Sequence, residues 1–170
     1  MPKLILFNGP SACGKSTLAR RYAHDHPLTL DLDIDEVCAM LGGWREDRRN
    51  AGMLARGIAL AAARTHLASG YDVVVPQLLA RPEFIEALES LAHEAGATFH
   101  EIVLLDSRAN MLRRFADRVD HPRGDTGDAE LLALYDRLMA LLPSRPDARI
   151  VPVEDGKPDE TYQAVLHALR

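Results

Sequence analysis

A glycine-rich segment near the start of the chain has the residue types and spacing of a phosphate-binding loop. Residues 9–16 read GPSACGKS, which matches GxxxxGK followed by Ser or Thr. The two glycines allow successive backbone N–H groups to turn toward an anion. Lys15 adds a positive charge for the outer phosphates, and Ser16 offers a hydroxyl to Mg²⁺. We expect nucleotide contacts from Gly9, Ser11, Ala12, Cys13, Gly14, Lys15, Ser16 and Thr17. The alternative is a glycine-rich turn that holds a lysine by chance.

Cys13 invites comparison with loops in which a cysteine is the nucleophile. Tyrosine-phosphatase loops need an arginine at the position that Ala19 occupies here, and Arg20 comes one residue too late. We therefore expect Cys13 to fill space in the loop and not to react.

Three carboxylates end the second apolar run of the chain, at Asp31, Asp33 and Asp35. Like charges repel at such a place, but the carboxyl edge of a parallel sheet is also where ligands bind in open α/β folds. A magnesium–phosphate cluster would relieve the repulsion at Asp33 and Asp35. The alternative for Asp35 is that it only caps a helix over 35–41. For Asp31 we expect a solvated side chain without a functional role.

Short apolar runs alternate with longer helical patterns along the whole chain. This alternation predicts an α/β fold of three layers with a mainly parallel five-stranded sheet. The expected strands are 3–8, 28–32, 72–76, 99–105 and 148–153. The expected helices are 15–24, 35–41, 50–69, 82–95, 108–119, 129–142 and 158–169.

Composition fits one domain over residues 1–170. Two cysteines exclude a disulfide framework and favour a reducing cytoplasm. No apolar run is long enough to span a membrane, and the N-terminal residues lack the features of a signal peptide. The net charge of −5 disfavours a protein that coats nucleic acid without sequence specificity. The sequence gives no indication of oligomeric state.

The segment after Leu32 resembles that of the small P-loop kinases, a group that includes adenylylsulfate kinase, gluconate kinase, chloramphenicol phosphotransferase, zeta-toxin-like kinases and polynucleotide kinase. Residues 32–37 read LDIDEV, close to the LDGDNV of adenylylsulfate kinases. The resemblance implies a P-loop fold that uses ATP and Mg²⁺. It also implies that Asp35 is the base for an acceptor hydroxyl and that Asp33 lies near Mg²⁺ or the acceptor.

Two later segments extend the resemblance. Arg114 and Arg118 resemble the RxxxR pair of the kinase lid, which we place at 114–128, and a shared helix face would point both at one nucleotide. Their alternative is a solvated face paired with nearby aspartates. The residues around Gly156 resemble the loop that lies beside adenine in these kinases.

The chain departs from these families on the acceptor side. Cys38 stands where adenylylsulfate and polynucleotide kinases carry an arginine, and Gln77 stands where many relatives carry Asp or Asn. Trp44 could stack on a ring of the acceptor, or it could simply cover the edge of the hydrophobic core. Arg45 could contact the acceptor, or it could belong to a solvated, charged turn. The candidate acceptor residues are Asp33, Asp35, Trp44, Arg45, Arg56, Gln77 and Arg81.

Together these features predict transfer of the ATP γ-phosphoryl group to a hydroxyl of a small molecule: a metabolite, nucleoside, sugar or antibiotic. The expected catalytic residues are Lys15, Asp35, Arg114 and Arg118. Two alternatives stay open. One is a polynucleotide 5′-hydroxyl kinase, which the net charge disfavours, and the other is a non-catalytic regulatory module that binds ATP. The chain has no NKxD motif, which disfavours a GTP switch.

Overall fold

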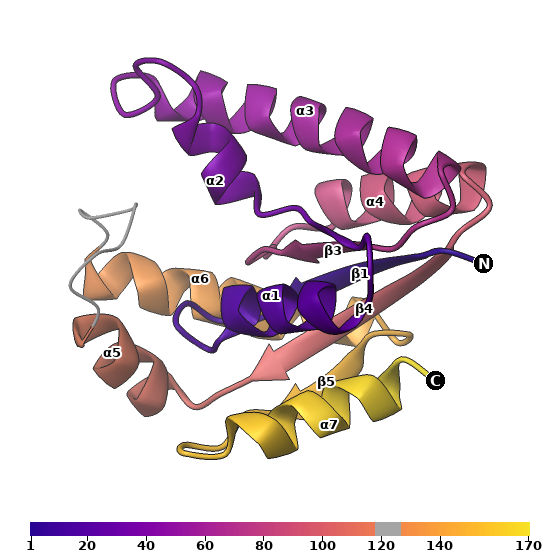
Figure 1. Cartoon of the computed structure of the whole chain (residues 1–170). Coiled ribbons are helices and arrows are strands. Elements are labelled where there is room, and N and C mark those ends of the chain that lie inside the picture. Colours follow the sequence, from indigo (N-terminus) through magenta and orange to yellow (C-terminus); the bar gives the residue numbers. More distant parts are fainter. Residues whose placement is uncertain (118–126) are drawn as a thin grey trace.

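The computed structural model describes residues 1–117 and 127–170. The strands of these residues are β1 (Lys3–Asn8), β2 (Leu30–Asp31), β3 (Val73–Pro76), β4 (Thr98–Leu105) and β5 (Arg149–Pro152). All of them run parallel in one sheet, in the order β2-β3-β1-β4-β5 (Figure 1). The helices are α1 (Lys15–Asp25), α2 (Ile34–Ala39), α3 (Arg48–Ala68), α4 (Pro82–Glu94), α5 (Arg108–Ala116), α6 (Asp128–Leu141) and α7 (Pro158–Ala168), with a short 3-10 turn at Leu142–Ser144.

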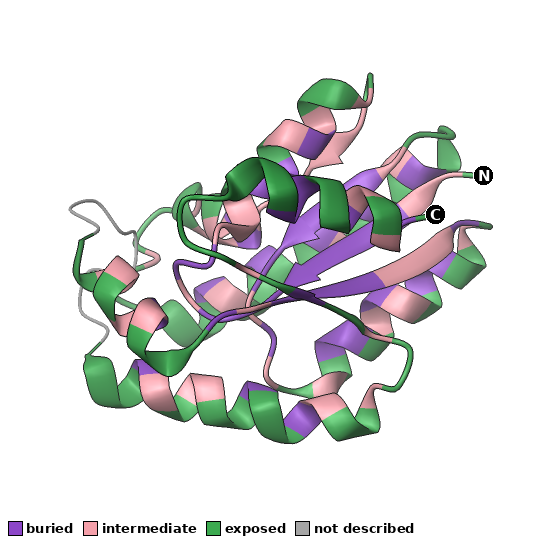
Figure 2. Ribbon diagram, turned by 90° about the horizontal axis from the view of Figure 1, so that it is seen from below, coloured by how far each residue is buried: buried purple, intermediate pink, exposed green. Residues whose placement is uncertain are grey.

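Alternate side chains of the central strand β1 face opposite layers of helices. Leu4 and Leu6 pack in one core cluster with residues of α3 and α4, whereas Ile5 and Phe7 pack in a second cluster with residues of α1 and α7. The two helix layers lie on opposite sides of the sheet in Figure 1, and Figure 2 shows the strands buried between them. A strand covered on both faces needs apolar residues at every position. The predicted three-layer fold with a parallel sheet is therefore confirmed.

The carboxyl ends of the strands gather at one edge of the sheet, on the left of Figure 1. The loop between β1 and α1 starts there, and α2 and α5 follow β2 and β4 on the same side. Strand β2 is shorter than the predicted 28–32. A turn with Leu28 at φ 63° precedes it, and Asp33 caps α2 directly after it. Asp33, which follows this short strand, lies close to the start of α1, where it bonds to Ser16.

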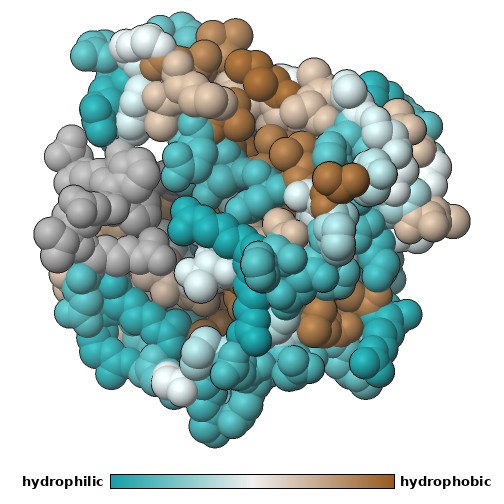
Figure 3. Space-filling view, in the orientation of Figure 1, coloured by the Kyte–Doolittle hydropathy of each residue, from teal (hydrophilic) through white to brown (hydrophobic). Residues whose placement is uncertain are grey.

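Hydrophobic side chains also gather on the surface of helices α2 and α3 (Figure 3). Met40, Met53, Leu54 and Ile58 are all exposed there. No helix in the described part of the chain is both long and apolar enough to cross a bilayer. Most of the segment predicted as a lid, 118–126 with Arg118, lies outside the described residues.

Candidate active site

The loop between β1 and α1 adopts a conformation that few residue types tolerate. Gly9 has φ 148° and Gly14 has φ 93°, and Ala12 lies between them at φ 60°. A Cβ on Gly9 would stand 2.4 Å from the backbone oxygen of Leu104, so β4 leaves room only for glycine. Gly14 is also the residue that precedes α1, and its left-handed backbone sets the direction in which the helix starts. The amino end of α1, with its free N–H groups, therefore faces the loop.

Lys15 folds back over this loop. Its ammonium group donates to the backbone oxygens of Gly9 at 2.9 Å and Pro10 at 2.7 Å. Ser11 is partly buried and Thr17 is exposed, while Cys13 is buried in the core cluster beneath the loop. The lysine charge thus lies against the loop whose spacing predicts phosphate binding, and Cys13 occupies the space-filling position expected of it.

Asp33 connects the phosphate-binding loop with the start of α2. Its Oδ2 accepts a hydrogen bond of 3.1 Å from the Ser16 hydroxyl, and its Oδ1 accepts one of 3.0 Å from the backbone N–H of Asp35. Asp33 is therefore the N-cap of α2, so the alternative in which Asp35 only caps this helix does not hold. Asp35 lies on the first turn of α2, two residues after the aspartate that bonds to Ser16.

Ser16 and Asp33 also form a donor pair that suits Mg²⁺. Their oxygens lie 3.1 Å apart, and Mg²⁺ in nucleotide sites takes one or two oxygen ligands from the protein and the rest from phosphate and water. Elsewhere in the described ranges, no group of three or more His, Cys, Asp or Glu side chains is placed to hold a metal ion. The pair Ser16–Asp33 is therefore a place where this chain could hold Mg²⁺.

Asp31 behaves differently from the solvated residue that the sequence suggested. Its side chain is partly buried, and its Oδ1 has no hydrogen-bond partner among the described residues. Burial, with a smaller contribution from the negative charge of Asp33, raises the pKa of Asp31 to about 6. The expectation fails because Asp31 pairs with Val74 of β3 inside the sheet, and Arg20 of α1 lies close enough to act on its charge.

Asn8, the last residue of β1, is a functional candidate that sequence reasoning missed. It has no exposed surface. Its Oδ1 accepts from the backbone N–H groups of Gly9 at 2.8 Å and Leu79 at 2.9 Å, and its amide donates to the Leu79 oxygen at 2.9 Å. Asn8 thus ties the phosphate-binding loop to the segment after β3. A polar residue at the end of an otherwise apolar strand was the signal available in the sequence.

The segment after β3 contributes to a hollow of about 350 Å³. Three predicted acceptor residues, Arg56, Gln77 and Arg81, line it together. The Arg56 guanidinium lies 5.3 Å above the ring of Phe84. Trp44 and Arg45 do not line this hollow. They stack on each other at 4.8 Å in the turn before α3, with Trp44 partly buried and Arg45 exposed.

Arg114 lies where two carboxylates hold its guanidinium. Nη1 is 2.9 Å from Oδ2 of Asp106, a buried residue at the end of β4, and Nε donates to Asp155 at 3.0 Å. Asp155 also pairs with Arg113, and hydrogen bonds from both arginines hold its pKa below the usual range. Asp155 is next to Gly156, which has φ 72°. The structure thus joins two segments predicted to contact the nucleotide, although no sequence pattern indicated Asp106 and Asp155 as their link.

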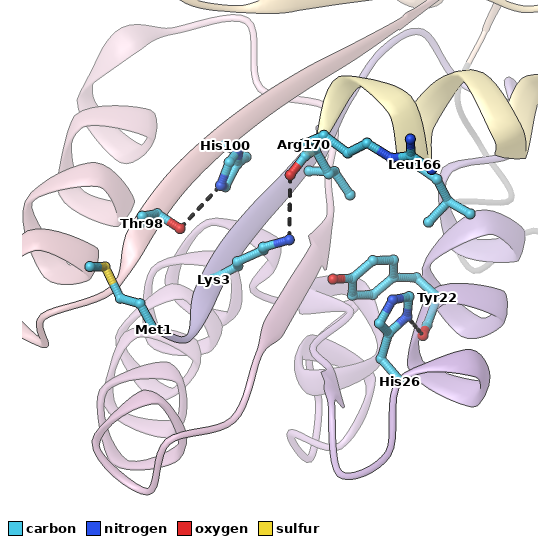
Figure 4. A pocket seen from close by; sticks show the side chains of 9 residues that line it. Met1, Lys3, Tyr22, His26, Thr98, His100, Leu166 and Arg170 are labelled. Carbon is cyan, nitrogen blue, oxygen red and sulfur yellow. Dashed lines mark hydrogen bonds between the residues drawn. The ribbon is translucent and has the colours of Figure 1, made fainter.

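A second hollow, of about 660 Å³, lies at the opposite edge of the sheet (Figure 4). It is lined by residues at the starts of β1 and β4, including Lys3, Thr98 and His100. Burial, together with the charges of Lys3 and Arg149, lowers the pKa of His100. Because this hollow is at the amino ends of the strands, it is separate from the phosphate-binding loop.

Comparison with known proteins places the chain among P-loop proteins. A family model described as AAA domain matches residues 4–141. No curated protein matches the chain by sequence. A kinase candidate from Chloroflexus aurantiacus is similar in structure, with a TM-score of 0.73 and 23% identity over 99% of this chain and 96% of its own.

Two solved kinases share the fold at lower similarity. A gluconokinase from Sinorhizobium meliloti has a TM-score of 0.65 and 19% identity over 99% of this chain and 91% of its own. The APS kinase CysC of Mycobacterium tuberculosis has a TM-score of 0.59 and 19% identity over 99% of this chain and 96% of its own. At such identities the likeness concerns the fold, which is that of small P-loop kinases.

Proposed function

This chain belongs to the AAA domain family, and we propose that it transfers the γ-phosphoryl group of ATP to a hydroxyl group of a small molecule. The observation that carries the proposal is the pair of hydrogen bonds that Asp33 accepts, one from the Ser16 hydroxyl and one from the backbone N–H of Asp35. These bonds fix one carboxylate at the phosphate-binding loop, and the second, that of Asp35, belongs to the first turn of α2. The kinases that share the fold support a small-molecule acceptor.

The phosphate-binding loop positions the donor. Backbone N–H groups of the loop and of the first turn of α1 bind phosphate oxygens, and the ammonium group of Lys15 exchanges its backbone partners for the outer phosphates. Ser16 and Asp33 would hold Mg²⁺, which would supply positive charge for the phosphates of the donor. Positioning and charge stabilisation of this kind account for most of catalysis in phosphoryl transfer.

Asp35 receives the proton that the acceptor must lose. The acceptor oxygen forms a bond to the γ-phosphorus while the bond from that phosphorus to the β-γ bridging oxygen breaks, and ADP departs with the electron pair. The hydroxyl proton passes to a carboxylate oxygen of Asp35. A base of this kind contributes on the order of 10²–10⁴ in rate. Arg114 would add positive charge on the nucleotide side, and the resemblance to the kinase lid assigns the same role to Arg118.

The substitution Asp35→Asn tests the role of the base. We expect acceptor-dependent release of ADP, measured with a panel of hydroxyl metabolites, nucleosides and antibiotics, to fall at least ~100-fold. The dissociation constant of ATP, measured by calorimetry, should stay within about threefold, a change under ~0.7 kcal/mol. Glu36→Gln, at the exposed neighbouring position, is the matched control and should keep full turnover. An Asp35→Asn variant with wild-type turnover would remove the base from the mechanism.

A further inference from the structure

The hollow beside β3 contains a buried polar group that the described protein does not satisfy. Gln77 is 6% exposed, and its Oε1 has no hydrogen-bond partner among the described residues. A buried polar atom without a partner costs on the order of 1–3 kcal/mol. Leucine or methionine would fill a purely structural position here without that cost. An amide at the wall of a hollow therefore indicates a polar ligand.

Three arginines from separate elements surround the same hollow. Arg56 comes from α3, Arg81 precedes α4, and Arg137 comes from α6. No carboxylate in the described ranges lies within ion-pairing distance of any of them, whereas Arg64, Arg108 and Arg145 each have such a partner. One acidic residue, Glu83, also lines the hollow, and it is exposed, as are the three arginines. Three cations against one anion leave the hollow positive in a chain whose net charge is −5.

The hollow adjoins the phosphate-binding loop through backbone contacts. The N–H of Gln77 donates to the Phe7 oxygen at 3.0 Å, and Asn8 bonds to both the N–H and the oxygen of Leu79 at 2.9 Å. Phe7 and Asn8 are the two residues directly before Gly9. A ligand held against Gln77 and Leu79 is therefore next to the start of the loop where the donor phosphates bind.

We propose that the acceptor is an alcohol that also carries an anionic group, a carboxylate, sulfate or phosphate. Arg81 and Arg137 bind the anion, Arg56 contributes charge from its position over Phe84, and Gln77 bonds to a hydroxyl. The inference rests on the proposed function and names the acceptor class. It adds Arg137, which no sequence pattern indicated. The volume of about 350 Å³ lies at the small end of ligand pockets, which span roughly 300–1,000 Å³, and suits a small metabolite.

The test measures binding and transfer separately. Calorimetry with a non-hydrolysable ATP analogue present compares gluconate, glycerate and glycerol 3-phosphate with neutral glucose and glycerol. Phosphoryl transfer from ATP to the same compounds is followed by mass spectrometry. Arg81→Gln and Arg137→Gln should each weaken binding of the acidic alcohols by about 10- to 100-fold, the range for loss of a charge-assisted contact. Arg64→Gln, further along α3 from Arg56, is the control and should leave that binding unchanged.

The outcomes separate the acceptor class from the kinase function. Binding of an acidic alcohol that weakens in Arg81→Gln and Arg137→Gln supports the inference, and the carboxylate and phosphate probes show which anion is preferred. Such binding without any transfer would keep the anion site and contradict the kinase function. Transfer to neutral alcohols as efficient as to acidic ones would keep the kinase function and overturn the inference. Failure of every acidic probe to bind, or insensitivity to both substitutions, would also overturn it.

Discussion

The close approach of Gly9 to β4 allows a quantitative test of the phosphate-binding loop. In Gly9→Ala the new Cβ would lie 2.4 Å from the Leu104 oxygen and 3.0 Å from the Cys13 sulfur. Ordinary carbon–oxygen contacts begin at about 3.3 Å, so the loop or β4 must move by nearly 1 Å. Neither partner yields readily, since the first is strand backbone and the second is a buried side chain.

The expected loss follows from two contributions. A non-glycine residue at φ 148° carries backbone strain of about 1–3 kcal/mol, and overpacking adds about 1–3 kcal/mol. The sum, about 2–6 kcal/mol, is a large part of the ~5–15 kcal/mol that stabilises an ordinary domain. Gly9→Ala should therefore unfold at a much lower urea concentration than the wild type, measured by circular dichroism.

Two other glycines separate these contributions. Gly14→Ala meets no atom within 4 Å but has φ 93°, so it should lose only the strain, about 1–2 kcal/mol. It should nevertheless bind ATP poorly because its backbone directs the N–H groups at the start of α1. Gly52→Ala, in α3 and also free of contacts, should gain about 0.5–1 kcal/mol. Equal stabilities of Gly9→Ala and Gly14→Ala would refute the steric reasoning.

Two further predictions concern buried polar groups. Asn8→Ala removes three hydrogen bonds that join the loop to the segment after β3. The free energy of unfolding in urea should fall by about 2–4 kcal/mol, and the KM for the acceptor should rise more than the KM for ATP. Equal changes in both KM values would contradict a linking role. In Asp31, a pKa raised to about 6 means that ionisation opposes folding, so wild-type stability should fall as pH rises from about 4 to about 6. The free energy of unfolding of Asp31→Asn should therefore exceed that of the wild type by ~1–2 kcal/mol above pH 6, and the difference should vanish below pH 4. A difference in stability that does not depend on pH would contradict the raised pKa of Asp31.

Local sequence signals were sufficient for the central strand and the loop that follows it. The continuous apolar run of β1 and the glycine spacing after it are properties of adjacent residues, and both correspond to the structure. The start of α2 was placed one residue late because Asp33 and Asp35 are both good N-cap residues. The choice depends on the bond from Ser16 to Asp33, which joins segments that are distant in sequence.

Long-range contacts explain what the sequence did not reveal. Arg137 lines the hollow of about 350 Å³ only because α6 meets the segment after β3 there, and Asp155 meets Arg114 only because β5 lies beside β4. The burial of Asp31 has the same origin. In each case the residue type is ordinary for a surface, and its role depends on a partner that periodicity and spacing do not identify.

The most direct test of the central claim is transfer of label from γ-phosphate-labelled ATP to an organic acceptor. The wild-type chain with Mg²⁺ and a panel of acidic alcohols should give a labelled phosphate ester, identified by chromatography and mass spectrometry. Lys15→Ala should give none. Label that appears only as inorganic phosphate, or an equal yield of ester from Lys15→Ala, would contradict phosphoryl transfer by this site.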